Sequence, residues 1–204
     1  MDEHGQEQEQ EQEQDSGLRS RLVDVGVALV AAEGVPALSL REIARRAGVS
    51  HGAPRRYFPT HLTLLSAIAR RGFESLADQA GAAIAAHEGD PRGQLTALAR
   101  SCLDFALTNR GMFELMFRHD LLESNQLGLR ETSLPLFATL VDLVARVRPE
   151  SGAEPRIVAG ALWANLHGIA QLWGWGSLQL AVGVDDAEPL LRAALDAHLG
   201  PEVR

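Results

Sequence analysis

The sequence predicts an all-α fold of about nine helices. Alanine, leucine and arginine dominate the composition while isoleucine, threonine and tyrosine are scarce, a mixture that favours helices over strands. From Leu18 onward, apolar residues recur every three or four positions, as they do along the buried face of a helix. No segment shows the apolar–polar alternation of a half-buried strand. With 204 residues, the chain is long enough to bury a sizeable core.

Residues 1–15 differ from the rest of the chain in composition. They carry seven acidic residues and no basic one, and residues 6–14 alternate glutamine with glutamate. Such a segment has too little apolar surface to offset the entropy of ordering, so we expect a disordered acidic tail and not a signal peptide. It is either a passive solubilising tail or an anionic arm that competes with DNA for a basic segment of the chain.

The first two helices are expected over residues 18–33 and 40–47. Gly34 ends the first of them. Ser39 opens the second with a predicted capping box, in which its hydroxyl accepts from the Glu42 N–H while the Glu42 carboxylate reaches back to the start of the helix.

A tight turn and a third, short helix follow. Gly48 stands where the turn requires a positive φ. Ser50 is expected to cap a helix that ends near Phe58. Because Pro54 lacks a backbone donor and disfavours helical geometry at Ala53, this helix should begin late or have a distorted first turn.

The rest of the chain is also helical in pattern. Clusters of glycine, proline and asparagine mark the breaks between helices. A fourth, longer helix is expected to begin at residues 59–60. Five more are expected near residues 92–109, 111–121, 127–147, 155–178 and 186–198.

Charge is distributed unevenly along the chain. The net charge is −8, and residues 1–15 and 73–204 each carry a net −7. Residues 16–72, by contrast, carry nine arginines against three acidic residues, a net of +6. A basic segment at one end of an acidic chain is the electrostatic pattern expected for binding a polyanion such as DNA.

The basic segment also has the spacing of a helix-turn-helix. Ala44 is small at the point where a second helix must cross closely, and Gly48 follows four residues later. Ile43, Val49 and Tyr57 are placed to form a small core between the helices. In such a motif, the N-terminal residues of the second helix reach the base edges in the major groove.

Residues 18–73 resemble the DNA-binding domain of TetR-family regulators. The matching string runs from Ser39 to Ser50 (Ser-Leu-Arg-Glu-Ile-Ala-Arg-Arg-Ala-Gly-Val-Ser) and continues with Tyr57-Phe58 and a helix that bears Leu64-Leu65. The resemblance implies a DNA-binding domain over residues 16–60 and a helical effector-binding and dimerisation domain over residues 61–204.

The resemblance also implies roles at the DNA surface. Arg55, Tyr57 and His61 stand where the family usually has tyrosine, histidine and lysine that touch phosphates, so the contact at His61 is either lost or dependent on pH. Arg45 and Arg46 either face DNA or belong to a solvated helix face. Phosphate or base contacts are expected from Ser39, Arg41, Ser50, His51, Gly52, Ala53, Arg55, Arg56, Tyr57 and His61.

The resemblance also implies that the C-terminal helices form an effector pocket and a dimer interface. The spacing of Trp163, His167 and Gly168 resembles a Trp-His-Gly subtype of these regulators. Small residues over 159–170 and an apolar last helix suit a four-helix interface between two copies. Pocket candidates, each of which could equally be ordinary core, are Phe105, Met112, Met116, Phe117, Leu140, Trp163, His167 and Trp173.

Other function classes find little support in the sequence. There is no nucleophile elbow, phosphate-binding glycine loop, dinucleotide fingerprint or His-Glu-x-x-His motif, and the seven histidines lack metal-ligand spacing. We therefore expect no enzyme activity, metal or cofactor. The single cysteine, Cys102, excludes an intrachain disulfide and fits a reducing cytoplasm, and no apolar run is long enough to span a membrane.

The resemblance to TetR-family regulators implies a bacterial, cytoplasmic, homodimeric repressor. It would bind a palindromic DNA operator and be released by a small apolar effector. Two alternatives remain open at this point. One is a transcriptional activator with the same DNA-binding domain. The other is a helical ligand-binding adaptor that has lost DNA binding, an interpretation that Pro54, the missing lysine and the acidic tail would favour.

Overall fold

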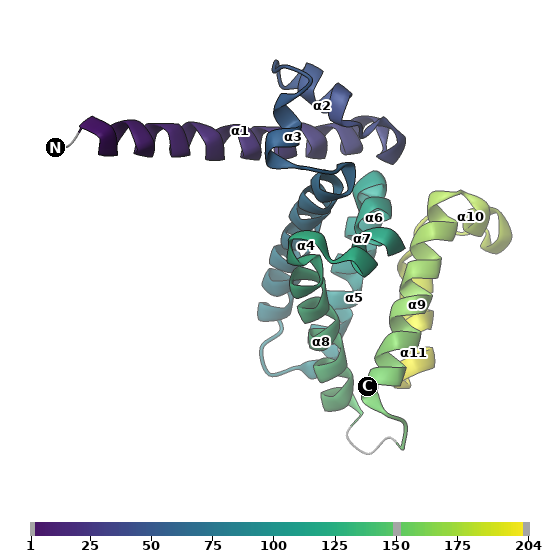
Figure 1. Cartoon of the computed structure of the whole chain (residues 1–204). Coiled ribbons are helices and arrows are strands. Elements are labelled where there is room, and N and C mark those ends of the chain that lie inside the picture. Colours follow the sequence, from purple (N-terminus) through teal and green to yellow (C-terminus); the bar gives the residue numbers. More distant parts are fainter. Residues whose placement is uncertain (1–2, 149–151, 202–204) are drawn as a thin grey trace. The chain divides into compact units, whose positions relative to one another are not determined.

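The computed structural model describes residues 3–148 and 152–201, with side chains from residue 17 onward. Within these ranges the regular elements are all helices, which confirms the predicted all-α class (Figure 1). Among the described helices, none is long and apolar enough to cross a membrane. The elements are α1 (Glu3–Glu33), η1 (Val35–Ala37), α2 (Leu40–Arg46), α3 (Ala53–Tyr57), α4 (His61–Ala85), α5 (Pro91–Thr108), α6 (Arg110–Met116), α7 (His119–Ser124), η2 (Gln126–Gly128), α8 (Leu129–Val147), α9 (Pro155–Gly174), α10 (Ser177–Val182) and α11 (Glu188–Leu199).

The described part of the chain has eleven α-helices, two more than the sequence predicted, because two expected helices are each divided. The helix expected over 111–121 is interrupted at Arg118, whose backbone is extended with φ −63° and ψ 127°. The helix expected over 155–178 is interrupted at Gly176, which has φ 76° and ψ −3°. A left-handed glycine of this kind cannot continue an α-helix.

Helix α1 ends where the sequence predicted. Gly34 has φ 77°, and its N–H donates to the Val30 carbonyl at 3.0 Å. At the other end, α1 begins at Glu3 within the acidic segment. The side chains of residues 1–16 lie outside the described part of the chain, so the expected disorder of residues 1–15 stays a prediction.

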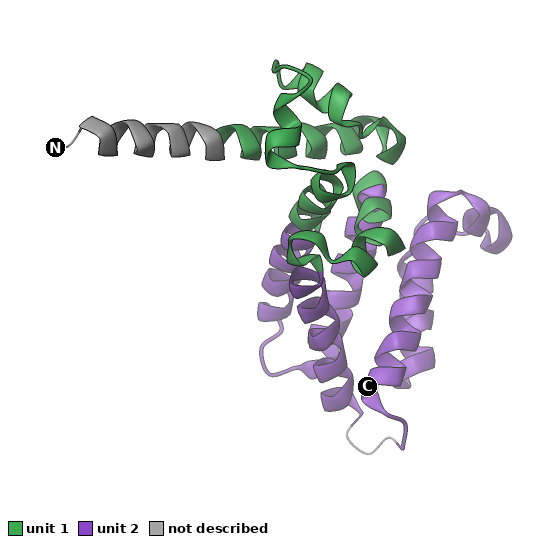
Figure 2. Ribbon diagram, viewed as in Figure 1, with its two compact units in different colours: residues 1–72, 111–129 green, residues 73–110, 130–204 purple. Residues whose placement is uncertain are grey.

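The chain divides into two compact units (Figure 2). The first holds residues 1–72 and 111–129, and the second holds residues 73–110 and 130–204. The chain passes between the units at three points, one of which lies within α4.

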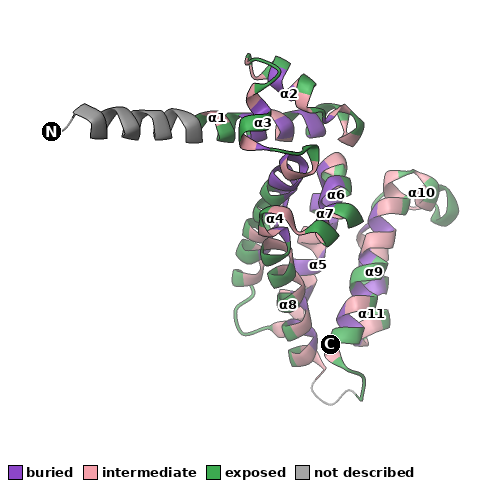
Figure 3. Ribbon diagram, viewed as in Figure 1, coloured by how far each residue is buried: buried purple, intermediate pink, exposed green. Residues whose placement is uncertain are grey.

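In the first unit, α1 packs against α2 and α3 around a small apolar core (Figure 3). Leu22, Ile43 and Phe58 are fully buried there, and each such side chain contributes about 1.5–3 kcal/mol of transfer free energy. Gly72 of α4 lies so close to α6 that a Cβ atom would come within 2.8 Å of side-chain atoms of Met112. This part of α4 and helix α6 are therefore closely packed on one another.

In the second unit, α9 packs against α5, α10 and α11. Arg100 of α5 pairs with Glu188 of α11 at 2.5 Å, which links these two helices. This packing leaves one side of α9 uncovered: Ile157 and Leu172 are 66% and 40% exposed, and Trp175, the residue that caps the end of α9, is 71% exposed.

Candidate nucleic-acid interface

Helix α2 begins as the sequence predicted, with Ser39 as its cap. The Glu42 N–H donates to the Ser39 hydroxyl at 3.1 Å. The second half of the predicted capping box is wrong, because the Glu42 carboxylate accepts instead from Arg45, at 2.9 and 2.6 Å, and from Arg46 at 2.7 Å. Hydrogen bonds from these two guanidinium groups lower the pKa of Glu42 from its ordinary 4.5 to about 2.

Arg46 has a second acidic partner outside α2. Its guanidinium also pairs with the Glu33 carboxylate at the end of α1. Arg46 therefore joins α1 to α2, whereas Arg45 is bonded to Glu42 of its own helix. Of the two interpretations left open for these arginines, the contacts favour an ion-pair network over direct DNA contact.

The turn between α2 and α3 has the expected geometry at Gly48, where φ is 67°. The Val49 N–H donates to the Ala44 carbonyl at 3.0 Å, and Ala44 is fully buried against the neighbouring helices. The absence of a side chain beyond Cβ at Ala44 is thus what lets α3 approach α2.

Helix α3 begins late, at Ala53, as Pro54 predicts. The expectation that Ser50 caps it is wrong, because the turn extends further and the cap residue is Gly52, without a side-chain cap. Ser50 contributes its backbone carbonyl instead, which accepts from the Ala53 N–H at 3.0 Å. Pro54 is buried in the first turn, where the missing N–H has no helical partner to lose.

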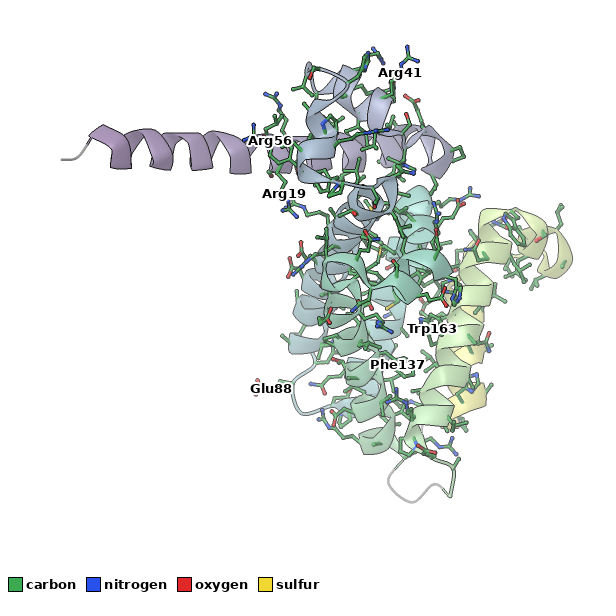
Figure 4. The ribbon with its side chains drawn as sticks, in the orientation of Figure 1. Arg19, Arg41, Arg56, Glu88, Phe137 and Trp163 are labelled. Carbon is green, nitrogen blue, oxygen red and sulfur yellow. The ribbon has the colours of Figure 1, made fainter. Side chains whose placement is uncertain are left out.

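The start of α3 and the outer side of α2 carry the exposed polar groups that sequence reasoning assigned to DNA. Ser50, His51 and Gly52 are exposed at the N-terminus of α3, while Ala53 is half-buried. Arg41 on α2 and Arg56 on α3 point away from these helices (Figure 4). The arrangement presents exposed cationic side chains from both α2 and α3, which suits a polyanion.

The end of α3 is fixed by two aromatic residues. The Tyr57 ring is half-buried with the Arg56 guanidinium 5.9 Å from its centroid, and Phe58 is fully buried. Arg19 of α1 places its guanidinium 5.4 Å from the Phe58 centroid. Arg19 thus makes a cation–π contact that the sequence did not single out.

His61, expected to contact phosphate, has a partner within the first unit. Its Nε2 donates to the Leu38 carbonyl at 2.7 Å, because a carbonyl oxygen can only accept. The side chain is exposed, and the expectation that its phosphate contact is either lost or dependent on pH stays a prediction.

The predicted pocket residues belong to both units. In the first unit, Met112 and Met116 pack against Gly72, and the rings of Phe113 and Phe117 are 4.8 Å apart. The remaining candidates, Phe105, Leu140, Trp163, His167 and Trp173, belong to the second unit.

Among these, the Trp163 and His167 rings are 5.2 Å apart, which confirms that they share a helix face. Burial lowers the pKa of His167 and so favours its neutral form. Phe105 and Leu140 are buried. The assignment of these residues to an effector pocket stays a prediction.

Two further contacts of the first unit show what sequence reasoning did not find. Glu33 pairs with Arg46 thirteen residues later, and Gln126 accepts from Thr63 sixty-three residues earlier. Neither spacing belongs to a local helix pattern, so only the crossing of the helices brings these pairs together.

Two family models match the chain. Residues 22–68 match the model of bacterial regulatory proteins of the tetR family. Residues 95–198, half of the chain, match the model of the tetracyclin repressor-like C-terminal domain. No curated protein matches the chain. The Trp-His-Gly subtype stays a prediction.

Solved structures agree with these matches. A Rhodococcus sp. RHA1 protein of unknown function is 28% identical, with a TM-score of 0.76 over 89% of this chain and 93% of its own. The multidrug binding protein EbrR, complexed with imidazole, is 25% identical, with a TM-score of 0.57 over 91% and 96%. The regulator PfmR from Thermus thermophilus shares the fold at 18% identity, with a TM-score of 0.65 over 90% and 100%. With both family models matched along its length, the chain belongs to the TetR family of DNA-binding transcriptional regulators, which are not enzymes.

Proposed function

We propose that this regulator is a cytoplasmic, homodimeric repressor that binds a palindromic operator and is released by a small apolar effector. The observation that carries the DNA-binding half of the proposal is the contrast between two pairs of arginines. The side chains of Arg41 and Arg55 are exposed, and their guanidinium groups make no hydrogen bond or ion pair with the described residues. Arg45 and Arg46 share the Glu42 carboxylate.

This contrast separates arginines that are available to bind a phosphate from arginines that are already paired with a carboxylate. A guanidinium that already pairs with a carboxylate would have to give up that partner in order to bind a phosphate. An unpaired guanidinium needs only to release its hydration and can bind two phosphate oxygens at once. Arg41 and Arg55 are therefore the phosphate contacts, with Arg56 and Tyr57 beside them, and Ser50 to Ala53 face the bases.

A dimer is supported by the uncovered side of α9. Ile157, Ala161, Ala164, Leu172 and Trp175 are exposed at helical spacing on this side, without an acidic or basic residue among them. Soluble monomers rarely leave so continuous an apolar strip in water. A second copy related by two-fold symmetry would cover it and would place two recognition helices roughly 34–36 Å or somewhat more apart.

Effector control follows from the same architecture. The structural relative EbrR is a multidrug binding protein that was solved with imidazole, which supports a small molecule as the effector of this regulator. Such a molecule releases DNA only if it binds more tightly to a state in which the recognition helices are wrongly spaced. A compound that raises the melting temperature of the protein should therefore also weaken operator binding.

The adaptor alternative loses one of its supports. Pro54 argues for it only if the proline interrupts the interior of a helix. Pro54 instead lies in the first turn of α3, where the helix tolerates it.

The salt dependence of operator binding tests the DNA-binding proposal. An operator is first recovered by in vitro selection with the full chain, and binding is then measured from low to high salt. Removing one phosphate contact lowers the slope of log K against log salt by about 0.9, so R41A or R55A should lower it by about 1.8 in a dimer.

The matched control for this experiment is R45A, which removes an arginine of the same helix that already has a partner. We expect it to leave the slope unchanged. An equal reduction of the slope in R45A and R41A would show that the paired arginines bind phosphate as well. A wild-type protein that selects no duplex at low salt would overturn DNA binding itself.

A further inference from the structure

The connector between α7 and α8, residues Asn125–Gly128, has an unusual backbone. Asn125 has φ 49°, Leu127 has φ 57° with ψ 24°, and Gly128 has φ 65°. Within the described ranges, Asn125 and Leu127 are the two non-glycine residues with positive φ. Leucine disfavours this conformation, which persists only where the surroundings hold it.

The surroundings that hold the connector belong to α4 and the residue just before it. The Gln126 side-chain oxygen accepts from the hydroxyls of Thr60, at 3.4 Å, and of Thr63. The Arg70 guanidinium donates to the Leu127 carbonyl at 3.1 Å. The connector is thus bonded to the start of α4 and again two turns further along the same helix.

The first turn of α4 is directly linked to the DNA-reading helices. It follows the buried Phe58 at the end of α3 by two residues. His61, the first residue of α4, also donates to the carbonyl of Leu38, which lies just before α2 begins. A side chain that holds this turn in place, as Gln126 does, therefore limits how far α2 and α3 can shift as a pair relative to the rest of α4.

The connector also leads out of the first unit. The first unit ends at Leu129, the first residue of α8, and the rest of α8 belongs to the second unit (Figure 2). The chain therefore enters the second unit shortly after a backbone segment that is bonded to the start of α4.

We propose that Gln126 and Arg70 are positioning residues for DNA reading, which act through the Asn125–Gly128 connector to limit the separations that the two recognition helices of a dimer can adopt. Neither residue needs to touch DNA. The proposal rests on the function proposed above, and it concerns the spacing between half-sites, not the choice of bases within one.

The test compares operators that differ only in the spacer between their half-sites. Binding to the selected operator and to versions with one base pair added or removed is measured for wild-type protein, Q126A and R70A. We expect the ratio of affinities between correct and incorrect spacing to fall at least threefold in both variants. The preferred bases of each half-site should not change.

R71A is the matched control. Arg71 is the neighbour of Arg70 on α4, is similarly exposed, and pairs with Asp24 of α1 at 3.3 Å without contacting the connector. We expect R71A to keep the wild-type spacing ratio. Hydrogen exchange of the amides of residues 61–66 should rise in Q126A and R70A and not in R71A.

The outcomes separate this inference from the function on which it rests. If Q126A and R70A weaken all operators by one common factor, the connector only stabilises the fold and the inference is overturned, while DNA binding stands. Unchanged hydrogen exchange in both variants would overturn it as well. A wild-type protein that binds no selected duplex overturns the proposed function, and the inference falls with it.

Discussion

Gly111, the second residue of α6, packs directly against the end of α1. A Cβ atom here would lie 2.6 Å from the Val30 carbonyl oxygen and 3.3 Å from the Gly34 Cα. The Val30 oxygen cannot move aside cheaply, because it accepts the Gly34 N–H that closes α1. This residue therefore determines how closely α6 approaches α1.

We predict that G111A destabilises the protein by about 1–3 kcal/mol, the usual cost of overpacking a tight contact. The midpoint of urea unfolding measures it. G81A is the control, because Gly81 lies in α4 with nothing near its Cβ position, and there the loss of backbone entropy in the unfolded chain should stabilise by about 0.5–1 kcal/mol. Equal midpoints for G111A and wild type would show that α6 has room to shift.

The Glu42 carboxylate gives stability a specific pH dependence. Its pKa falls from 4.5 to about 2 because Arg45 and Arg46 donate to it in the folded state. A group with a depressed folded pKa stabilises the fold fully above its unfolded pKa and loses that effect as pH falls through the folded pKa. The contribution of Glu42 is thus complete above about pH 4.5 and disappears towards pH 2.

We predict that E42Q melts below the wild type near neutral pH and that this difference shrinks as the pH falls from 4.5 towards 2. The difference should be small, since the ion pairs are exposed to solvent. E88Q is the control, because Glu88 is exposed and makes no pair with the described residues. Thermal melts at each pH measure the effect, and a constant difference across the range would contradict it.

At the scale of elements, the sequence predicted features that depend on neighbouring residues, such as caps and turns. It did not predict how the helices cross one another. The Ser39 cap, the positive φ of Gly48 and the late start of α3 each depend on residues within four positions of one another. The predicted Ser50 cap is wrong although its signal is local, because the preference of serine for caps does not say how long the preceding turn is. The apolar pattern continues across the breaks after α6 and α9, at Arg118 and Gly176, so it does not predict them.

In the candidate site too, local features could be predicted from the sequence and contacts between helices could not. Sequence reasoning found the exposed residues at the start of α3, because a helix-turn-helix defines them by position. It could not separate Arg41 from Arg45 and Arg46, since that depends on which arginine reaches the Glu42 carboxylate or Glu33 across the α1–α2 crossing. Side-chain partners between elements require the three-dimensional structure.

The uncovered side of α9 leads to a prediction about assembly. Ala164 lies in the middle of the exposed strip, and Gly168 one turn later has open space at its Cβ position. If α9 lies at a two-fold interface, a glutamate at residue 164 would be buried there close to its own copy. We predict that A164E raises the dimer dissociation constant at least tenfold, about 1.4 kcal/mol.

Sedimentation at micromolar concentration measures this change. The control is A82E, which places the same charge on an exposed alanine of α4. A dimeric A164E would show that α9 is not the interface, and a monomeric wild type would remove dimerisation from the proposed function.

At the scale of the whole molecule, the distribution of charge matters more than its sum. The net charge of the chain is −8, yet residues 16–72 carry a net charge of +6. The seven acidic residues of residues 1–15 directly precede this basic segment in the chain. Those acids and DNA phosphates would compete for the same arginines. The competition is electrostatic, so it must weaken as the Debye length falls from about 10 Å at 0.1 M salt to about 3 Å at 1 M.

We predict that deleting residues 1–15 tightens operator binding several-fold at low salt and that the two proteins converge as salt is added. Replacing the four glutamates of residues 6–14 by glutamine keeps the length of the segment and removes four charges, so it should reproduce most of the effect. If the deletion tightens binding while the glutamine variant does not, the segment obstructs DNA by its bulk. Unchanged affinity of both variants at low salt would leave residues 1–15 as a passive solubilising tail.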